Sequence, residues 1–450
     1  MSVLTWTENR PLELTVSERL AQVAASHHGM WNYVTYRDAI GLLGLDPGEI
    51  YPEGSTRLDP GTWADLGWLT CFCGPPASAV EAMRAAVTAE SLNQYTPDLI
   101  EPLRDEAAAQ FGRARDGRFE VVGTEGAQAG LALALLATVN PGDEVIVSDP
   151  GYFHIPSAVL VAGATPVAVA IRPDTGFRLD PAAVAAAITP RTRAICIVDP
   201  VNPYGTVQTP AELEALAELA ERHRLLLIHD VTHAPLAIGT DDPFVSLPAL
   251  ELTDNAVAVM SVSHCFGMAG ARIGFLGGPP GLVRGCLQLK AALTRLNTNL
   301  ISQHGAVAAL RDHEYLTSAA RTIAGNLAHL ETTLADVPGA RLVVRPRRGL
   351  ACAVDVSGTG ASAQELMVSL FARRVAVYPA DGLGDTAAGS TIRLNLSRPD
   401  AWAMDHLRQV LPAAVREAAS GRWREPVLGL LGRKGTRRAA ALADQIRRRP

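Results

Sequence analysis

The chain has 450 residues and a net charge of −6, with 48% hydrophobic and 19% charged residues. This composition excludes a disordered chain and provides for a sizeable core in roughly two to three domains. The negative charge gives no general case for nucleic acid, and no apolar run reaches the roughly 18 residues of a membrane helix. The six cysteines are sparse and no signal peptide opens the chain, so we expect reduced thiols in a cytoplasmic protein.

Residues 1–70 are predicted to form an extension that packs with a small C-terminal domain. A capping box from Thr15 to Glu18 begins a helix that we expect to end near Gly29, and a second helix is expected over 36–43. The prolines and glycines that follow indicate irregular chain up to the main domain.

Strand and helix patterns alternate over residues 71–320, which we interpret as the large, ligand-binding domain. Helices are expected over 79–89, 101–111, 127–137 and 211–223. Strands are expected over 119–122, 144–148, 165–169, 194–198, 225–229, 256–261 and 273–276. Short apolar strands with helices between them indicate an α/β fold, in which helices cover both faces of a mostly parallel sheet. In such sheets ligands bind at the carboxyl ends of the strands.

Residues 321–420 predict a smaller α+β domain. Its expected helices cover 318–335, 363–373 and 401–419, and its expected strands cover 341–344, 352–355, 375–378 and 391–396. Residues 421–450 carry nine basic residues against Glu425 and Asp444. We interpret this basic tail as a solvated terminal helix, with an interaction tail as the alternative.

A glycine-bearing turn after the strand 119–122 is the first candidate site. Gly126, Ala127 and Gln128 open a helix there, and their backbone N–H groups would suit a phosphate. A glycine before a helix is common, so this pattern is weak when taken alone.

Polar side chains also follow three later strands. Tyr152, Asn202 and Asp230 each stand after a different predicted strand. An aspartate at the inner end of an apolar strand is costly unless it is paired, so we expect a cationic partner for Asp230.

The segment 261–274 reads SVSHCFGMAGARIG and places Ser261, Ser263 and Arg272 around His264. Two hydroxyls, a glycine-rich turn and a guanidinium form a second phosphate-binding pattern. One titratable side chain, His264, lies within it.

Together these motifs resemble the fold type I pyridoxal-phosphate enzymes, specifically the class I/II aminotransferases, over about residues 70–415. The resemblance implies pyridoxal 5′-phosphate or pyridoxamine 5′-phosphate as cofactor, a small amino acid as substrate and a homodimer. By this resemblance the phosphate ligands would be Gly126, Ala127, Gln128, Ser261, Ser263 and Arg272.

The resemblance also assigns roles to single residues. Tyr152 would stack on the pyridine ring, and Asn202 would bond the ring hydroxyl. Asp230 would keep the ring nitrogen protonated as an electron sink, so Tyr152 and Asp230 are both counted as catalytic. Tyr95, in NQYTPD, would reach the phosphate bound by the partner subunit. Arg393, in TIRLNLS, would clamp the substrate carboxylate.

Two positions depart from the family pattern. His233 stands where the family has a tyrosine that bonds the ring oxygen, a bond that an imidazole can still donate. His264 stands in the position of the lysine that makes a Schiff base with the cofactor, which histidine cannot make. The two lysines of the chain are Lys290, in a separate predicted helix, and Lys434, in the tail. We therefore predict non-covalent cofactor binding with His264 as the acid/base.

Other interpretations stay open. The chain is alternatively a non-catalytic pseudoenzyme or binding module, or an ordinary aminotransferase that carries a lysine-to-histidine change. A metal site at His229, Asp230, His233 and His264 is disfavoured, because strand alternation points the first two to opposite faces. No metal is predicted.

The reaction type is also open between elimination or cyclisation, racemisation, retro-aldol cleavage and a transamination half-reaction. The stretch MWNYVTYRDAIGLLGLDPGE looks like the extension of capreomycidine synthase, which favours a biosynthetic role in specialised metabolism.

Overall fold

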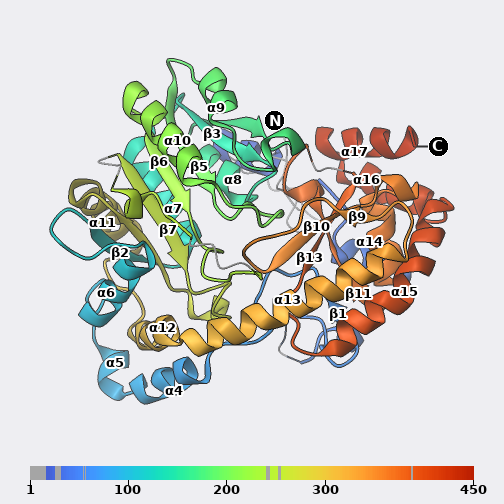
Figure 1. Cartoon of the computed structure of the whole chain (residues 1–450), viewed down its shortest axis with the longest axis horizontal. Coiled ribbons are helices and arrows are strands. Elements are labelled where there is room, and N and C mark those ends of the chain that lie inside the picture. The colour runs from blue at the N-terminus through green and yellow to red at the C-terminus, as the bar shows by residue number, and fades with distance from the viewer. Residues whose placement is uncertain are drawn as a thin grey trace.

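The structure is a computed structural model, and it describes residues 17–25, 32–53, 55, 57–239, 244–251, 255–386 and 389–449. A large domain and a small domain lie side by side, and the long helix α13 (His313–Ala335) runs between them (Figure 1). The capping residue Thr15 and the helix end near Gly29 lie outside the described residues. Among those described, no helix is long and apolar enough to cross a membrane.

A seven-stranded sheet forms the centre of the large domain. In sheet order its strands are β2 (Glu120–Thr124), β8 (Gly274–Gly278), β7 (Ala256–Ser261), β6 (Leu226–Asp230), β5 (Thr192–Val198), β3 (Glu144–Asp149) and β4 (Thr165–Ala170). All neighbours are parallel except β8, which runs antiparallel to β2 and β7. The predicted mostly parallel sheet is confirmed.

Helices cover both faces of this sheet. The helices of the large domain are α4 (Ala77–Ala86), α5 (Ala89–Asn93), α6 (Glu101–Gln110), α7 (Ala127–Thr138), α8 (His154–Val161), α9 (Pro181–Ala187), α10 (Pro210–His223), α11 (Pro280–Thr294) and α12 (Leu300–Arg311). Helices α7, α8 and α11 pack on one face, and α9 and α10 pack on the other. Alternate residues of the inner strands enter these two cores, which is why the strands are apolar throughout.

The reversed direction of β8 shapes one edge of the sheet. Gly274 begins β8 and pairs with Thr124, the last residue of β2. The residues just before β8 therefore lie at the same edge as the carboxyl ends of the parallel strands. This reversal brings the segment after β7 back beside the N-terminus of α7.

The small domain contains a four-stranded antiparallel sheet. In sheet order its strands are β12 (Tyr378–Pro379), β13 (Thr391–Asn395), β10 (Ala351–Asp355) and β9 (Arg341–Leu342), and its helices are α13, α14 (Ala363–Phe371) and α15 (Ala401–Ala419). The predicted strand 375–378 is two pieces, because β11 (Val375–Ala376) pairs instead with β1 (Ala64–Asp65) of the N-terminal extension.

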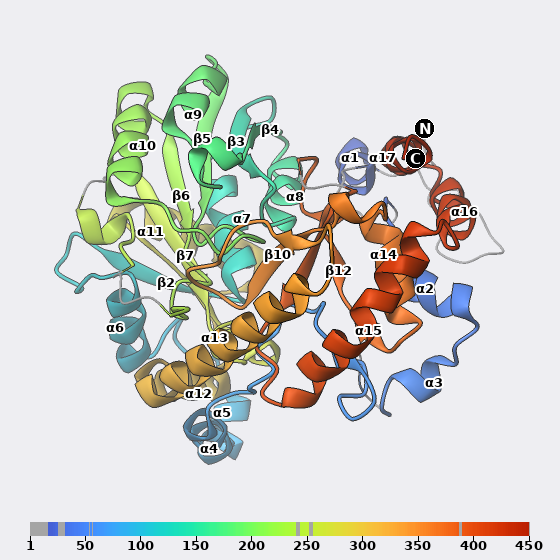
Figure 2. The same ribbon diagram turned by 45° about the vertical axis from the view of Figure 1, so that its right-hand side comes forward.

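The other elements of the extension are α1 (Glu18–Ala25), α2 (Tyr36–Leu43) and α3 (Pro47–Ile50), of which α3 falls in the stretch predicted to be irregular. The side of the small domain seen in Figure 2 carries α2, α14 and α16 (Arg424–Lys434). The Tyr33 and Tyr378 hydroxyls lie 2.8 Å apart, which ties the extension to β12.

The last thirty residues differ from the single solvated helix that their charge predicts. They form α16 (Arg424–Lys434) and α17 (Arg437–Arg447), and both helices bury an apolar face. Lys434 Nζ lies 2.7 Å from Asp38 Oδ2, so a basic side chain of the tail pairs with the N-terminal extension. Apolar residues at a helical spacing in this stretch indicate that both helices pack against the rest of the protein. The high positive charge instead favoured the prediction of a solvated helix.

Candidate functional site

One cavity of about 200 Å³ lies at the carboxyl edge of the large sheet. Its lining residues are Gly126, Ala127, Gln128, Tyr152, Val198, Asn202, Asp230, Thr232, His233, Ser261, Ser263, His264, Ala269 and Arg272. Eleven of these were selected from the sequence, and they come from the ends of β2, β3, β5, β6 and β7 and from the turn before β8. The order of strands in the sheet therefore gathers residues that are far apart in the chain.

The N-terminus of α7 forms an anion cradle at one end of the cavity. Gly126 is the N-cap with a φ of 93°, and no side chain caps this helix, which leaves the first backbone N–H groups to a ligand. A Cβ atom at Gly126 would lie 2.7 Å from Arg272 Nη2, and one at Gly274 would lie 2.5 Å from the Gly126 carbonyl carbon. Only glycines permit this approach, so Arg272 can reach over the helix terminus.

Arg272 is itself held in place. Its Nη1 donates to Ala269 O at 3.0 Å and its Nη2 donates to Glu125 O at 2.5 Å. Ser261 Oγ accepts from Ser263 N at 3.3 Å, which sets the two serines on one turn. Helix N–H groups, two hydroxyls and a guanidinium are donors that suit a phosphate dianion.

Within the described chain, Asp230 lacks an ion-pair partner and Asn202 has amide atoms without a hydrogen-bond partner. Asp230 Oδ1 accepts from Thr232 N at 3.0 Å and from Thr232 Oγ1 at 2.5 Å, and no cationic side chain in the described ranges forms an ion pair with it. Burial raises the pKa of its carboxyl. Both side-chain amide atoms of Asn202 are buried without a hydrogen-bond partner. A ligand with a cationic ring nitrogen and a ring hydroxyl would satisfy both residues.

Tyr152 forms a wall of the same cavity. Its hydroxyl donates to Gln128 Oε1 at 3.4 Å, and burial raises its pKa. The phenol is therefore neutral, and its ring is available for stacking against a planar ligand. Phosphate donors, an acid for a ring nitrogen, an amide for a hydroxyl and a ring for stacking fit pyridoxal phosphate.

His264 lies inside the cavity in a defined tautomer. Its Nδ1 lies 2.5 Å from Leu69 O, and because a carbonyl only accepts, Nδ1 carries the proton and Nε2 has the lone pair. Burial lowers the pKa of His264 to about 4, although the Leu69 carbonyl favours the charged form. The imidazole is therefore neutral and able to accept a proton near neutral pH.

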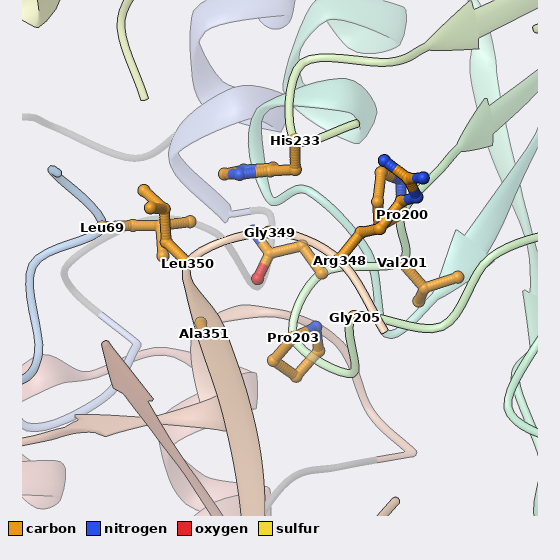
Figure 3. Close-up of a pocket in the computed structure, with 11 residues that line it drawn as sticks. Leu69, Pro200, Val201, Pro203, Gly205, His233, Arg348, Gly349, Leu350 and Ala351 are labelled. Atoms are coloured by element: carbon orange, nitrogen blue, oxygen red, sulfur yellow. The ribbon is translucent and has the colours of Figure 1, made fainter. Parts of the chain in front are cut away.

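His233 stacks on His264, with ring centroids 4.8 Å apart and an angle of 29° between the planes. Burial, with His264 and Arg393 nearby, holds its pKa well below its usual range. Its Nδ1 is buried without a partner in the described chain. Figure 3 shows His233 above Gly349, at the seam where the loop containing Pro203 and Gly205 meets the small domain.

Neither lysine lines the cavity. Lys290 is buried in α11, and its Nζ lies 2.6 Å from Asp98 Oδ1 and 2.7 Å from Thr298 Oγ1. Lys434 pairs with Asp38 at the far side of the small domain.

Arg393 lies on β13 with 3% of its surface exposed. Its Nη2 donates to Gly67 O at 3.0 Å, and its guanidinium carbon lies 4.5 Å from the centroid of the Tyr378 ring. Its Nε is buried without a partner, and no carboxylate in the described ranges forms an ion pair with it. Burial lowers its pKa. Arg393 does not line the 200 Å³ cavity, but it is close enough to lower the pKa values of His233 and His264.

Tyr95 does not join the other predicted residues within one chain. Its side chain is 77% exposed, and Arg295 lies over its ring at 4.4 Å. It lines a separate surface groove of about 590 Å³ between α4, α5 and α12.

His229 points away from the cavity. Its Nε2 lies 3.2 Å from Asp199 Oδ2, and its Nδ1 accepts from Leu247 N at 3.2 Å. The alternation along β6 thus separates His229 from Asp230, as the sequence predicts. Within the described ranges, no group of three or more metal-ligating side chains is arranged around a common point.

The functional residues that were not predicted from the sequence lie mainly in the N-terminal extension. Leu69 contributes a backbone carbonyl, which has no signature in the sequence. Tyr33, Tyr36 and Tyr378 surround Arg393 and shift its pKa. The run NYVTY carries the first two and was the available signal, but its packing beside β13 depends on the fold.

Comparisons with known proteins agree with this geometry. Residues 70–411 match the family of class I and II aminotransferases. The chain is 35% identical over 301 residues to the arginine–pyruvate transaminase AruH of Pseudomonas aeruginosa, across 63% of this chain and 72% of that protein. It is 36% identical over 241 residues to an aspartate/prephenate aminotransferase of Cereibacter sphaeroides, a match that spans 52% of this chain and only 60% of that protein.

A solved structure shares most of the architecture. The chain is similar to N-succinyldiaminopimelate aminotransferase from Mycobacterium tuberculosis, with a TM-score of 0.75 and 26% identity. This similarity covers 89% of the present chain and 100% of that one.

Proposed function

The chain belongs to the family of class I and II aminotransferases, and from that membership we propose that it is an enzyme that acts on an amino acid with non-covalently bound pyridoxal 5′-phosphate or pyridoxamine 5′-phosphate. The observation that carries the proposal is that the cavity built from the predicted cofactor ligands contains His264 and no lysine. A Schiff base between protein and cofactor needs a primary amine, which this cavity does not supply.

The residues of the cavity divide the work of holding the cofactor. The α7 N-terminus, Ser261, Ser263 and Arg272 bind the phosphate. Asp230 holds a proton on the ring nitrogen, and the positive charge of that nitrogen offsets the cost of burying the Asp230 carboxylate. Asn202 bonds the ring hydroxyl. When bound, the cofactor supplies an electron sink that acidifies the α-carbon of the amino acid.

His264 would act as the acid/base. Its Nε2 carries the lone pair, and its low pKa keeps that lone pair free near neutral pH. Proton transfer by a positioned imidazole is typically worth about 10²–10⁴-fold. His233 would donate a hydrogen bond to the ring oxygen in place of the tyrosine usual at that position.

Arg393 would clamp the carboxylate of the amino acid. A buried guanidinium without an acidic partner is costly, and a substrate carboxylate would supply the missing charge. The names of the relatives, which act on arginine, aspartate and prephenate, favour an amino-acid substrate without selecting one.

A homodimer is the proposed assembly. Tyr95 lines the α4–α5–α12 groove and is exposed, and Val87 and Leu92, which follow its lining residues Ala86 and Ser91 in the chain, are exposed as well. A second copy on this face would cover these side chains and bring Tyr95 toward the phosphate of the other subunit.

Absorbance spectroscopy of the purified protein with pyridoxal phosphate tests the proposal. We expect the cofactor to be lost on dialysis and not to be fixed to the protein by borohydride. His264→Lys is the positive control, because it should retain the cofactor on dialysis and become labelled on reduction. A pyridoxyl group found on Lys290 or Lys434 of the wild-type protein by mass spectrometry would contradict non-covalent binding. Binding without any turnover would favour the pseudoenzyme alternative.

A further inference from the structure

A short segment links the carboxylate clamp to the acid/base. Residues 66–72, here named the strap, follow β1 and cross between the two domains. Leu66 N donates to Ala376 O at 2.9 Å, and Leu66 O accepts from Asn395 N at 2.7 Å. The strap therefore begins as an extension of the small-domain backbone.

Four of the strap carbonyls, that of Leu66 included, accept hydrogen bonds from the small domain. Gly67 O accepts from Arg393 Nη2 at 3.0 Å. Trp68 O and Thr70 O both accept from Asn395 Nδ2, each at 2.6 Å. A single amide group thus holds the carbonyls on both sides of Leu69.

The Leu69 carbonyl is the exception. It accepts from His264 Nδ1 of the large domain, while its two neighbours are held by Asn395. Thr70 O also accepts from Ser397 Oγ at 3.2 Å, whereas Asn395 Nδ2 bonds both carbonyls that flank Leu69 and so helps to fix the direction of the Leu69 carbonyl between them.

The orientation of the Asn395 amide is itself determined by its surroundings. Asn395 is fully buried, and its Oδ1 accepts from Ser397 N and from Ser397 Oγ, both at 2.8 Å. A flipped amide would face the Ser397 N–H with a donor and the two strap carbonyls with an acceptor. Only the observed orientation satisfies all of these groups.

We infer that Asn395 is a positioning residue that selects the tautomer of His264 by aiming the Leu69 carbonyl at Nδ1. The Nδ1–H tautomer leaves Nε2 as the basic nitrogen, and the opposite tautomer would place a proton on Nε2. The meaning of this selection for catalysis rests on the proposed acid/base role of His264. The tautomer itself is a property of the cofactor-free protein.

Nitrogen-15 NMR of histidine side chains measures the tautomer directly. In the cofactor-free wild-type protein we expect His264 with a protonated Nδ1 and an unprotonated Nε2, assigned by the signals missing in His264→Gln. An Nε2–H tautomer in the wild type would by itself overturn the inference.

Asn395→Asp is the sharper variant, because it keeps the acceptor for Ser397 and loses both donated bonds to the strap. Asn395→Ala removes the acceptor for Ser397 as well as the two bonds donated to the strap. In each we expect the ratio of Nδ1–H to Nε2–H to fall by a factor of about 2–10, the range for one net hydrogen bond. An unchanged ratio in a variant that remains folded by circular dichroism would overturn the inference.

Asn326→Ala is the matched control. Asn326 Nδ2 also donates to two backbone carbonyls, Leu396 O at 2.8 Å and Arg398 O at 2.7 Å, but it does not bond the strap. We expect its tautomer ratio to equal that of the wild type, and an equal shift in this variant would show general loosening and overturn the specific role of Asn395.

The two proposals fail separately. If Asn395→Asp shifts the tautomer but His264→Ala leaves α-proton exchange unchanged, Asn395 positions a histidine that is not the base. If α-proton exchange depends on His264 but the tautomer ratio is unchanged in the Asn395 variants, the acid/base role stands and the positioning role is wrong.

Discussion

At the scale of single residues, two neutral imidazoles share one wall of the cavity. His233 and His264 stack, and burial lowers the pKa of both. A proton on His233 is further disfavoured by His264, and nearby Arg393 disfavours a proton on either ring. Both rings are therefore unprotonated at rest near neutral pH, which leaves a lone pair free to accept a proton, and the pKa of His264 lies below the near-neutral value that is best for a general base.

Replacing His264 distinguishes an active enzyme from a non-catalytic pseudoenzyme. With pyridoxal phosphate and a bound amino acid in deuterated water, we expect the wild type to exchange the α-proton for deuterium. His264→Ala should slow this exchange by about 10²–10⁴-fold, because only the positioned base is lost. NMR of the amino acid measures the exchange, and cofactor affinity should change little. Equal rates in the two proteins would exclude His264 as the base.

Replacing Arg393 tests the carboxylate clamp. Arg393→Gln should weaken amino-acid binding by about 2–5 kcal/mol, because a desolvated carboxylate would lose its charged partner. Titration calorimetry of the cofactor-loaded protein measures this affinity. Arg345→Gln is the control, since its pair with Glu331 is at the surface and should leave binding unchanged. Undiminished binding in Arg393→Gln would show that another group holds the carboxylate.

The histidine pair also makes stability depend on pH. His264 has a folded-state pKa of about 4 against an ordinary value of 6.5, and His233 is shifted in the same direction. Below pH 6.5 the unfolded chain binds these protons and the folded protein does not, so the free energy of unfolding should decrease as the pH falls from 6.5 toward 4. Above 6.5 the two groups should contribute no slope.

Urea unfolding of the cofactor-free protein across this window measures the effect. A variant with both His233→Gln and His264→Gln should show a shallower decrease, and carboxylates common to both proteins cancel in the comparison. An identical pH dependence in the two proteins would mean that the imidazoles are not buried in the neutral form.

Most of the lining residues of the cavity could be predicted from the sequence, because each follows an apolar strand and parallel strands end at one edge. The Leu69 carbonyl and the Asn395 amide could not. A backbone carbonyl is present in every residue, so Leu69 has no distinguishing pattern. Asn395 reaches the carbonyls on either side of Leu69 only in the folded chain, where β1 pairs with β11. Tyr95 lies outside the cavity, and its proposed role, which belongs to a second subunit, is not tested by a single chain.

At the scale of elements, helices absent from the sequence-based expectation account for the main differences, among them α8, α9 and the longer α12. The apolar run of α8 contains Pro156 and lacks a polar face, and α9 is a short alanine-rich helix. Neither has the amphipathic period that identifies a surface helix. Asp180, the N-cap of α9, was the local signal that the expectation left unused.

The terminal helix α17 should contribute to stability despite its charge. Leu442 is 2% exposed, so Leu442→Ala should lower the free energy of unfolding by about 2–5 kcal/mol through lost burial and a cavity. Ala441→Ser, at an exposed position of the same helix, should change it by less than about 0.5 kcal/mol. Chemical denaturation measures both, and equal stability of Leu442→Ala and wild type would mean that α17 is detached in solution.

At the scale of the whole molecule, the large and small domains lie side by side (Figure 1). The 200 Å³ cavity is lined by residues of the large domain, and the α4–α5–α12 groove is lined by other elements of that domain. The cofactor ligands come from the large domain, while Arg393 and Asn395 come from the small domain. The proposed dimer would place Tyr95 of one subunit within reach of the cavity of the other, so assembly and cofactor binding should be linked.

Disrupting the exposed apolar face tests this link. Leu92 is 69% exposed in α5, and Leu92→Asp would place a charge in the proposed interface. We expect a monomer by light scattering and weaker cofactor binding by fluorescence titration. Val161→Asp, an exposed position on α8 away from this groove, should leave both unchanged. A wild-type protein that is already monomeric would contradict the proposed assembly.

Because lysine is scarce, the protein offers few side chains to electrophiles that modify primary amines. Of its 40 basic residues, only Lys290 and Lys434 carry a side-chain primary amine, and carboxylates hold both ammonium groups. Reagents such as N-hydroxysuccinimide esters, formaldehyde and glutaraldehyde therefore find few side chains to modify. The aldehyde of the proposed pyridoxal phosphate would thus meet little competition from side-chain amines of the protein. Amine-directed cross-linking would leave its subunits largely unjoined, however tightly they associate.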